Sequence, residues 1–317
     1  MPQTYGKKIA SRFGYGEALA EIGEKNKRVV AVGADVTGST GVNVFAEKFP
    51  DRYIQLGIAE QNVITVSAGL AIAGMLPFAC AYSVFITGRG WDQIRNSVCY
   101  PNLDVKIAGS HAGVTVGPDG ATHQATEEIA TMRVLPNMKV IVPADYVEAK
   151  KATLAMPDIK GPVFIRLCRV PMPIITPPDE RFVFGKAKIM KPGGDVVIFA
   201  CGSMVYESLT AAEALAGEGI DARVVNIHTV KPLDEETVIK SVKECGCAVT
   251  AEEHQSAGGL GGAIAETLAK NYPVPVEMVG LKDEFGESGE PEELMTKFNL
   301  KYEDIIKACK KSVKRKK

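Results

Sequence analysis

The sequence predicts an α/β protein with two domains, each a mainly parallel sheet flanked by helices. First, short apolar runs rich in β-branched residues alternate with helical patterns along the chain, which is typical of βαβ units. Second, 317 residues with 46% hydrophobic content suffice for two cores. Third, a segment with four prolines, residues 170–185, interrupts this alternation and cannot hold a helix or a central strand.

The first predicted domain, residues 1–185, includes this proline-rich linker. Its apolar runs predict strands at 28–35, 52–58, 77–83, 105–110, 139–144 and 162–168. Helical patterns fit between them, at 15–24, 60–73, 91–99, 126–132 and 146–155. Strands and helices therefore largely alternate, as in a parallel sheet covered on both faces.

The second predicted domain, residues 186–317, restarts the alternation. Strands are expected at 195–201, 222–227, 247–253 and 274–281. Helices are expected at 206–216, after Asp234 and at 260–270. The last eight residues, KKSVKRKK, carry six positive charges, and we interpret them as a solvated basic tail, with an anionic partner as the alternative.

Charge and cysteine usage exclude several classes of protein. With 37 Lys plus Arg against 38 Asp plus Glu, no overall field favours nucleic acid or an anionic membrane. Seven cysteines without a CxxC pair, and an N-terminus without an apolar signal region, favour a cytoplasmic protein with free thiols. Residues 61–88 carry no charge, but Gly69, Gly74 and Pro77 favour a helix followed by a strand over a membrane span.

The densest polar cluster of the first domain, residues 109–128, directly follows a predicted strand. Ligands of α/β sheets bind at the carboxyl ends of the strands, so His111, Asp119 and His123 are candidate site residues. The alternative is a glycine-rich surface loop whose histidines bond to the backbone. Glu60 begins a long uncharged helix, and its carboxylate either suits the helix dipole or performs proton transfer.

Other sequence signals are weaker. Residues 33–40 follow the first strand and offer backbone N–H groups and hydroxyls to an anion. They lack the P-loop lysine and the spacing of a dinucleotide fingerprint. His and Cys residues show no metal-ligand spacing, so no metal site is expected on this chain.

Several of these segments resemble the pyrimidine-binding domain of transketolases. They are RYIQLGIAEQN (52–62), AGLAIAGMLPFACAYSVFITGRGWDQIRN (68–96) and GSHAGVTVGPDGATHQATEEIATMRVLPNMKVIVPAD (109–145). NIHTVKPLD (226–234) and AEEHQSAGGLGG (251–262) resemble the transketolase C-terminal domain. The GDG motif, which binds the diphosphate metal in the family's N-terminal domain, does not occur in this sequence. The resemblance therefore implies the C-terminal subunit of a split transketolase.

The resemblance also implies a cofactor, a reaction and partners. Thiamine diphosphate would be shared with an N-terminal subunit that binds most of the Mg²⁺ (or Ca²⁺), in a dimer of heterodimers. The reaction would move a two-carbon ketol unit from a ketose phosphate to an aldose phosphate. Glu60, His123 and His111 would be catalytic. The cofactor would be bound by Glu60, Phe85, Tyr82 and Asp35, and the sugar phosphates by Arg12, Ser39, His111, Asp119, His123 and Arg169.

Purely structural roles for some of these residues, and other functions for the chain, remain as alternatives to what the resemblance implies. Without the resemblance, Tyr82 and Phe85 would be read as core aromatics, and Arg12 and Arg169 as partners in surface salt bridges. The nearest rival function is the E1 β subunit of a 2-oxo acid dehydrogenase, whose loop usually differs around its histidine. Deoxyxylulose phosphate synthase typically has Arg where His111 stands. A non-catalytic relic would have no reason to keep the candidate residues together.

Overall fold

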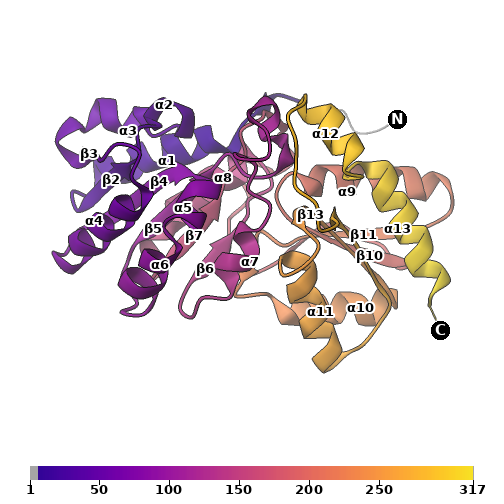
Figure 1. The fold of residues 1–317 in the computed structure, drawn as a ribbon. Coiled ribbons are helices and arrows are strands. Elements are labelled where there is room, and N and C mark those ends of the chain that lie inside the picture. The colour runs from indigo at the N-terminus through magenta and orange to yellow at the C-terminus, as the bar shows by residue number, and fades with distance from the viewer. Residues whose placement is uncertain (1–5, 317) are drawn as a thin grey trace.

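The computed structural model describes residues 6–316 and places two sheets side by side (Figure 1). The first sheet has seven strands in the order β12-β6-β7-β5-β4-β2-β3. All neighbours are parallel except the edge strand β12, which is antiparallel to β6. The strands are β2 (Val29–Gly33), β3 (Tyr53–Gln55), β4 (Leu76–Tyr82), β5 (Lys106–Ser110), β6 (Lys139–Ile141), β7 (Val163–Arg166) and β12 (Thr229–Lys231). A separate antiparallel pair joins β1 (Lys8–Ile9) to β8 (Met172–Pro173).

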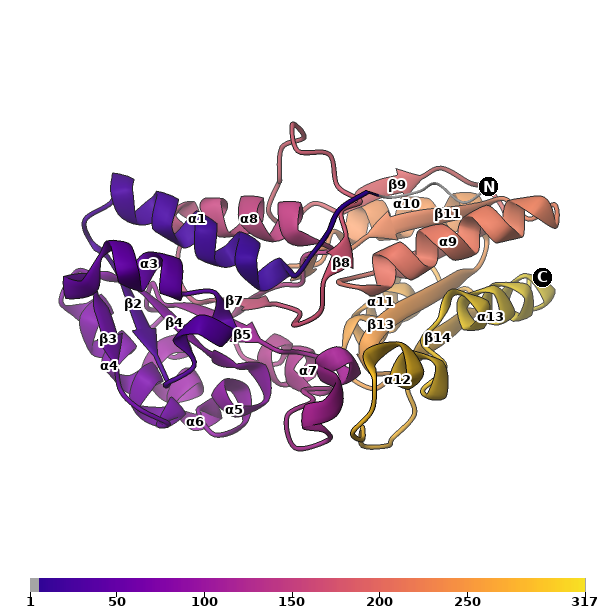
Figure 2. The ribbon, with the colours of Figure 1, turned by 90° about the horizontal axis from the view of Figure 1, so that it is seen from above.

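Helices cover both faces of the first sheet (Figure 2). One face carries α1 (Ser11–Lys25), α3 (Asn43–Lys48) and α8 (Tyr146–Ala155), with the short α2 (Thr37–Thr40) nearby. The other face carries α4 (Glu60–Ile72), α5 (Ser83–Gly88), α6 (Trp91–Gln93) and α7 (Glu128–Arg133). Every residue of β2 and β5 is buried, which explains why β2 is a continuous apolar run without alternation.

The second sheet has five strands in the order β14-β13-β10-β11-β9. Only the edge strand β9 is antiparallel to its neighbour. The strands are β9 (Lys188–Lys191), β10 (Val196–Ala200), β11 (Ala222–Asn226), β13 (Ala248–Gln255) and β14 (Val276–Leu281). The helices α9 (Met204–Gly217) and α13 (Tyr302–Lys314) cover one face, and α10 (Glu235–Cys245) and α11 (Leu260–Asn271) cover the other. The helix α12 (Pro291–Lys297) lies near the first sheet's loops.

The two sheets share one continuous hydrophobic core. It includes Phe164 of β7 and Phe199 of β10, from different sheets. These observations confirm the predicted fold class. The boundary at 170–185 stays a prediction, because β12 follows that segment in the chain yet completes the first sheet.

Two local expectations differ from the structure. The helix expected over 91–99 is short at α6 and continues as a π-helix over Ile94–Cys99, and the segment 83–88 forms the unexpected helix α5. Helix α13, which was not predicted, extends to Lys314 and includes most of the basic tail, but the tail's Lys311 and Arg315 side chains are 68% and 51% exposed. Ser312 is fully buried and donates a hydrogen bond to the Ala248 carbonyl (2.9 Å), while Lys311 and Arg315 pair with Glu277.

The uncharged stretch 61–88 forms most of α4, all of β4 and α5. Within residues 6–316, none of the helices combines the length and the apolar character that crossing a bilayer would need.

Where the two sheets meet, Glu148 of α8 is buried against Asn226 at the end of β11. Its carboxylate accepts hydrogen bonds from the Ala144 N–H (2.7 Å) and from Asn226 Nδ2 (2.9 Å). Burial raises the pKa of Glu148 from 4.5 to about 7 despite these bonds. Between these two values the folded chain therefore binds more protons than the unfolded chain, and stability falls as pH rises.

Glu148→Gln should flatten this pH dependence of the unfolding free energy. The neutral amide keeps an acceptor for Ala144, and Asn226 Oδ1, which lacks a hydrogen bond among the described residues, can accept from the new amide after a flip. Urea unfolding at pH 5 and pH 7 measures the effect, with Glu293→Gln on the exposed side of α12 as the control. If the unfolding free energy of Glu148→Gln changed with pH as much as that of the wild type, the Glu148 carboxyl would not be the source of the pH dependence.

Candidate active site

The candidate site lies at the carboxyl ends of the neighbouring strands β4 and β5. Tyr82 is the last residue of β4 and pairs in register with Ser110, the last residue of β5. The chain turns directly from Tyr82 into α5, which carries Phe85, and from Ser110 into the loop that begins with His111. Adjacent parallel strands thus bring two distant segments to one edge of the sheet.

Four rings gather at this edge. The ring centroids of Tyr82 and His111 are 4.3 Å apart, and those of Phe85 and His123 are 5.1 Å apart with the rings nearly perpendicular. Tyr82 lies 6.3 Å from both Phe85 and His123. We call these four residues the ring cluster. The candidate histidines are therefore not on a plain surface loop, and Phe85 belongs to a helix at the strand end, only partly buried.

His111 is held as a neutral imidazole. It is 4% exposed, its backbone has φ 59°, and its Nδ1 lies 2.9 Å from Ser110 Oγ. Burial, reinforced by the positive charges of Arg12 and Arg169, lowers the pKa of His111 from 6.5 to about 3. Its ring therefore offers one donor and one acceptor at neutral pH.

Two arginines lie close to His111, and Asp119 lies beside one of them. Arg12 Nη1 donates to the Arg169 carbonyl (2.7 Å), and Arg169 Nη1 approaches Asp119 Oδ1 (3.6 Å) and donates to the Val116 carbonyl. Burial lowers the pKa of Arg12. Two guanidinium groups next to a neutral imidazole make this end of the site positive, which suits a phosphate.

Glu60 is the first residue of α4 and is 4% exposed. Its carboxylate is bound by Arg89 Nη1, 3.2 Å from Oε1 and 3.1 Å from Oε2. The Arg89 guanidinium also lies over the Phe85 ring, 4.1 Å from its centroid. Glu60 is thus linked to the ring cluster through Arg89.

Arg89 was not among the candidate residues predicted from the sequence. A signal was present, because Arg89 is the charge that ends the neutral stretch 61–88 and follows Phe85 by four residues, the spacing of side chains on one helix face. Its pairing with Glu60 could not be read from the sequence, because it depends on how α4 and α5 pack.

Asp35 and Ser39 follow β2 in the chain, and among the described residues their side chains are not bonded to the ring cluster. Both side chains are exposed. Asp35 has φ 58°, and its N–H donates to Gln55 Oε1 (2.7 Å). Among residues 6–316, no hydrogen bond or ion pair joins either side chain to the other candidate residues.

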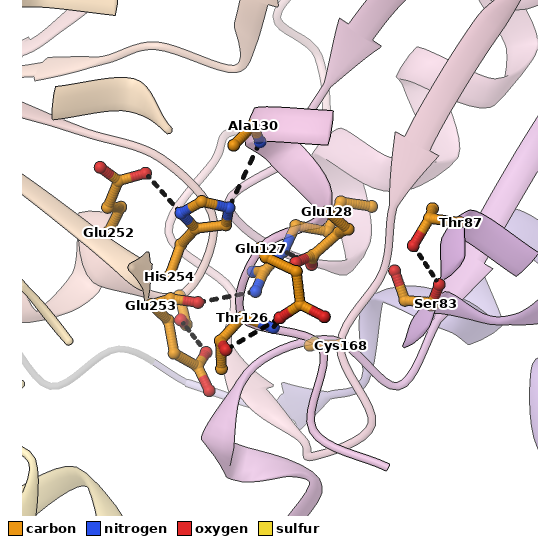
Figure 3. Close-up of polar contacts among 12 residues, drawn as sticks. Ser83, Thr87, Thr126, Glu127, Glu128, Ala130, Cys168, Glu252, Glu253 and His254 are labelled. Carbon is orange, nitrogen blue, oxygen red and sulfur yellow. Dashed lines mark hydrogen bonds and ion pairs between the residues drawn. The ribbon is translucent and has the colours of Figure 1, made fainter. Parts of the chain in front are cut away.

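A buried polar network lies behind the loop that carries the histidines (Figure 3). Glu128 of α7 accepts from Arg166 Nε (2.5 Å), and Arg166 Nη2 donates to the Glu253 carbonyl of β13 (2.7 Å). Next along β13, the carboxylate of Glu252 accepts from the first N–H groups of α11, and the His254 Nε2 accepts from the Ala130 N–H (3.3 Å). Sequence reasoning did not assign these acids a role, although consecutive charges in an apolar strand were a visible signal.

No group of three or more His, Cys, Asp or Glu side chains that could hold a metal ion occurs in the part of the chain that the structure describes. The candidate site combines the four rings, the guanidinium groups of Arg12, Arg89 and Arg169, the buried carboxylate of Glu60 and the exposed carboxylate of Asp119.

The family models and the known proteins that match this chain point to one family. Residues 7–173 match the transketolase pyrimidine binding domain, and residues 185–305 match the transketolase C-terminal domain. The chain is 45% identical to the putative transketolase C-terminal section of Methanocaldococcus jannaschii, over 96% of each chain. It is 43% identical to the 6-deoxy-6-sulfo-D-fructose transketolase subunit SqwH of Clostridium sp. (strain MSTE9), over 95% of this chain and 94% of the relative.

A solved structure described as a split gene transketolase, inactive beta4 tetramer, superposes with a TM-score of 0.92 at 47% identity. The match covers 98% of this chain and 100% of that one. With both domain families matched in order and full-length relatives of the same extent, the chain belongs to the transketolase family, as a C-terminal subunit of the split type.

Proposed function

We propose that the chain, with an N-terminal partner subunit, transfers a two-carbon ketol unit from a ketose phosphate to an aldose phosphate by means of thiamine diphosphate. The observation that carries the proposal is the meeting of Glu60, the ring cluster and the Arg12–Arg169 pair at one sheet edge. The cofactor would supply the stabilised carbanion that breaks and forms the carbon–carbon bonds. The chain would bind, orient and move protons.

The residues near Phe85 fit the cofactor's pyrimidine ring. A flat cation, the Arg89 guanidinium, already lies over Phe85 and hydrogen-bonds Glu60. A planar heteroaromatic ring could make the same two contacts, stacking on Phe85 and bonding the carboxyl group. In that position Glu60 would hold a proton toward the ring nitrogen, with Tyr82 and Asp35 beside the cofactor. A ring on the same face of Phe85 would displace Arg89.

The other end of the site suits the sugar phosphates. The neutral His111 ring can donate a hydrogen bond to a substrate hydroxyl or to a developing alkoxide, and the His123 ring could do the same. Asp119, exposed in the same loop, would accept from the aldose hydroxyl next to its carbonyl. Arg12, Arg169 and Ser39 would bind the phosphate.

A partner is needed to complete this site. A diphosphate needs a cation or several donors, and the metal, Mg²⁺ or Ca²⁺, would be held mainly by the N-terminal subunit. The relative described as an inactive tetramer of beta subunits supports a chain that requires a second kind of subunit. The assembly we propose is a cytoplasmic dimer of heterodimers.

Reconstitution tests the function. The chain is mixed with its N-terminal subunit, thiamine diphosphate and Mg²⁺, and assayed with xylulose 5-phosphate and ribose 5-phosphate. Because one relative is named for a sulfosugar, 6-deoxy-6-sulfofructose is assayed as a second donor. We expect ketol transfer by the pair and none by either subunit alone. Turnover of pyruvate instead would favour the 2-oxo acid dehydrogenase reading, and no turnover with any substrate would favour a non-catalytic relic.

Arg169→Ala should raise KM for phosphorylated sugars more than KM for unphosphorylated ones. We expect about tenfold or more for the phosphorylated acceptor, because a charge-assisted contact is lost. Steady-state kinetics with ribose 5-phosphate and ribose measures the difference, with Arg133→Ala as the control, since Arg133 pairs with Glu266 on another surface. Equal changes with both sugars would count against phosphate binding by Arg169.

A further inference from the structure

The loop that carries the candidate substrate residues rests on a carboxylate from the second sheet. Glu253 of β13 is 2% exposed, and its Oε1 accepts from the Thr115 N–H (2.7 Å) in the middle of that loop. Its Oε2 accepts from Ser203 Oγ (2.8 Å), next to the start of α9. These two bonds tie one loop amide of the first domain to the body of the second.

The Glu253 carboxylate can come this close to the loop because residue 113, just before the helical turn of the loop, is glycine. Gly113 has φ 83°, and a Cβ placed on it would lie 2.2 Å from Glu253 Oε1. Only glycine therefore lets the carboxylate come this close without a shift. The missing side chain at Gly113 thus leaves the space that the Glu253 carboxylate occupies.

Glu253 is itself fixed by its neighbours. Its backbone carbonyl accepts from Arg166 Nη2, and Arg166 is bound to Glu128. Glu128 begins α7, a few residues after the loop. The chain of contacts thus runs from the loop amide through β13 and β7 to the element that follows the loop.

A second contact from the C-terminal half holds the same loop. Gln124 Nε2 donates to the Val114 carbonyl (3.0 Å) inside the loop and to the Glu287 carbonyl (2.8 Å) of the segment before α12. The loop of His111, Asp119 and His123 is therefore gripped near its middle and near its end. Free loops of this length and glycine content would otherwise sample many conformations.

We propose that Glu253 is a positioning residue: it fixes the Thr115 amide and thereby sets how His111, Asp119 and His123 meet the substrate. This inference rests on the proposed function of that loop. It assigns the C-terminal domain a defined part in catalysis, as the rigid template against which the substrate loop of the first domain is formed. In this role Glu253 would act through Thr115 and would not itself touch substrate or cofactor.

The first test follows the loop in the isolated full-length chain. Glu253→Ala removes the acceptor, and we expect amide exchange in residues 113–124 to accelerate by about tenfold or more, as for the loss of a hydrogen bond to a charged group. Glu253→Gln keeps a carbonyl acceptor for Thr115 and should restore most of the protection. Asp234→Ala is the matched control, because this buried carboxylate caps α10 and contacts no part of the loop.

The second test uses the reconstituted enzyme. Glu253→Ala should raise KM for the acceptor sugar about tenfold, with thiamine diphosphate affinity within about threefold of wild type and with rescue by Glu253→Gln. If Glu253→Ala does not fold, Ser203→Ala removes one of the two bonds and should show smaller changes of the same kind.

Unchanged exchange in residues 113–124 would overturn the proposal. So would an equal rise in KM in Asp234→Ala, which would show a general effect of destabilisation. If wild-type subunits show no turnover at all, the proposed function fails, and the exchange experiment still decides whether Glu253 fixes the loop.

Discussion

Glu60→Gln should lower kcat of the reconstituted enzyme by about 100- to 10,000-fold, the usual range for a group that transfers a proton in the rate-determining steps. The amide can still hydrogen-bond a ring nitrogen but cannot give up and take back a proton. The fold should be unaffected, because Glu60 loses only its pair with Arg89, whose side chain is 52% exposed. Steady-state kinetics, with circular dichroism for the fold, measures both.

A control separates this effect from a change of charge. Glu47→Gln on α3 alters an exposed carboxylate and should leave kcat within about twofold of wild type. If Glu60→Gln kept activity within about tenfold of wild type, about 1.4 kcal/mol of barrier, Glu60 would have no part in proton transfer.

Glu128→Ala should destabilise the chain by about 3–5 kcal/mol, the cost of leaving one member of a buried ion pair without its partner. Glu128 is 1% exposed and Arg166 is 6% exposed, and their contact is 2.5 Å long. The variant would leave the Arg166 guanidinium buried between the two sheets with only the Glu253 carbonyl to bind it. Urea unfolding of the full chain measures the loss.

The matched control is an ion pair on the surface. Glu266→Ala removes the partner of Arg133, but Glu266 is 58% exposed, so we expect a loss of about 0–1 kcal/mol. Similar losses of unfolding free energy in both variants would mean that burial does not increase the cost of breaking the Glu128–Arg166 pair.

The sequence predicted what depends on local pattern. Strands such as β2 and β10 were visible because every residue in them is apolar or glycine, and the loop after β5 was visible because polar and glycine residues cluster after a strand. The rule that ligands bind at the carboxyl ends of strands then brought His111 and His123 to the site. Tyr82 and Phe85, which only the family resemblance had indicated, contact the rings of these histidines.

Contacts between distant segments could not be predicted in this way. Glu60 and Arg89 are 29 residues apart, and Thr115 and Glu253 are 138 apart, so both contacts depend on how the elements pack. Helix α13 was missed for a different reason. The charges of the basic tail were counted, but the spacing of Ile305, Cys309 and Ser312 along one buried helix face was overlooked.

The position of β12 at the edge of the first sheet affects how the chain folds while it is being synthesised on the ribosome. β6 gains its outer partner only when residues 229–231 have been synthesised, almost ninety positions after β6 itself. At about 5–20 residues per second, the nascent β6 edge stays uncovered for roughly 4–18 s. During that interval its free N–H and C=O groups could pair with another newly made strand, and this exposure ends only when β12 covers the edge.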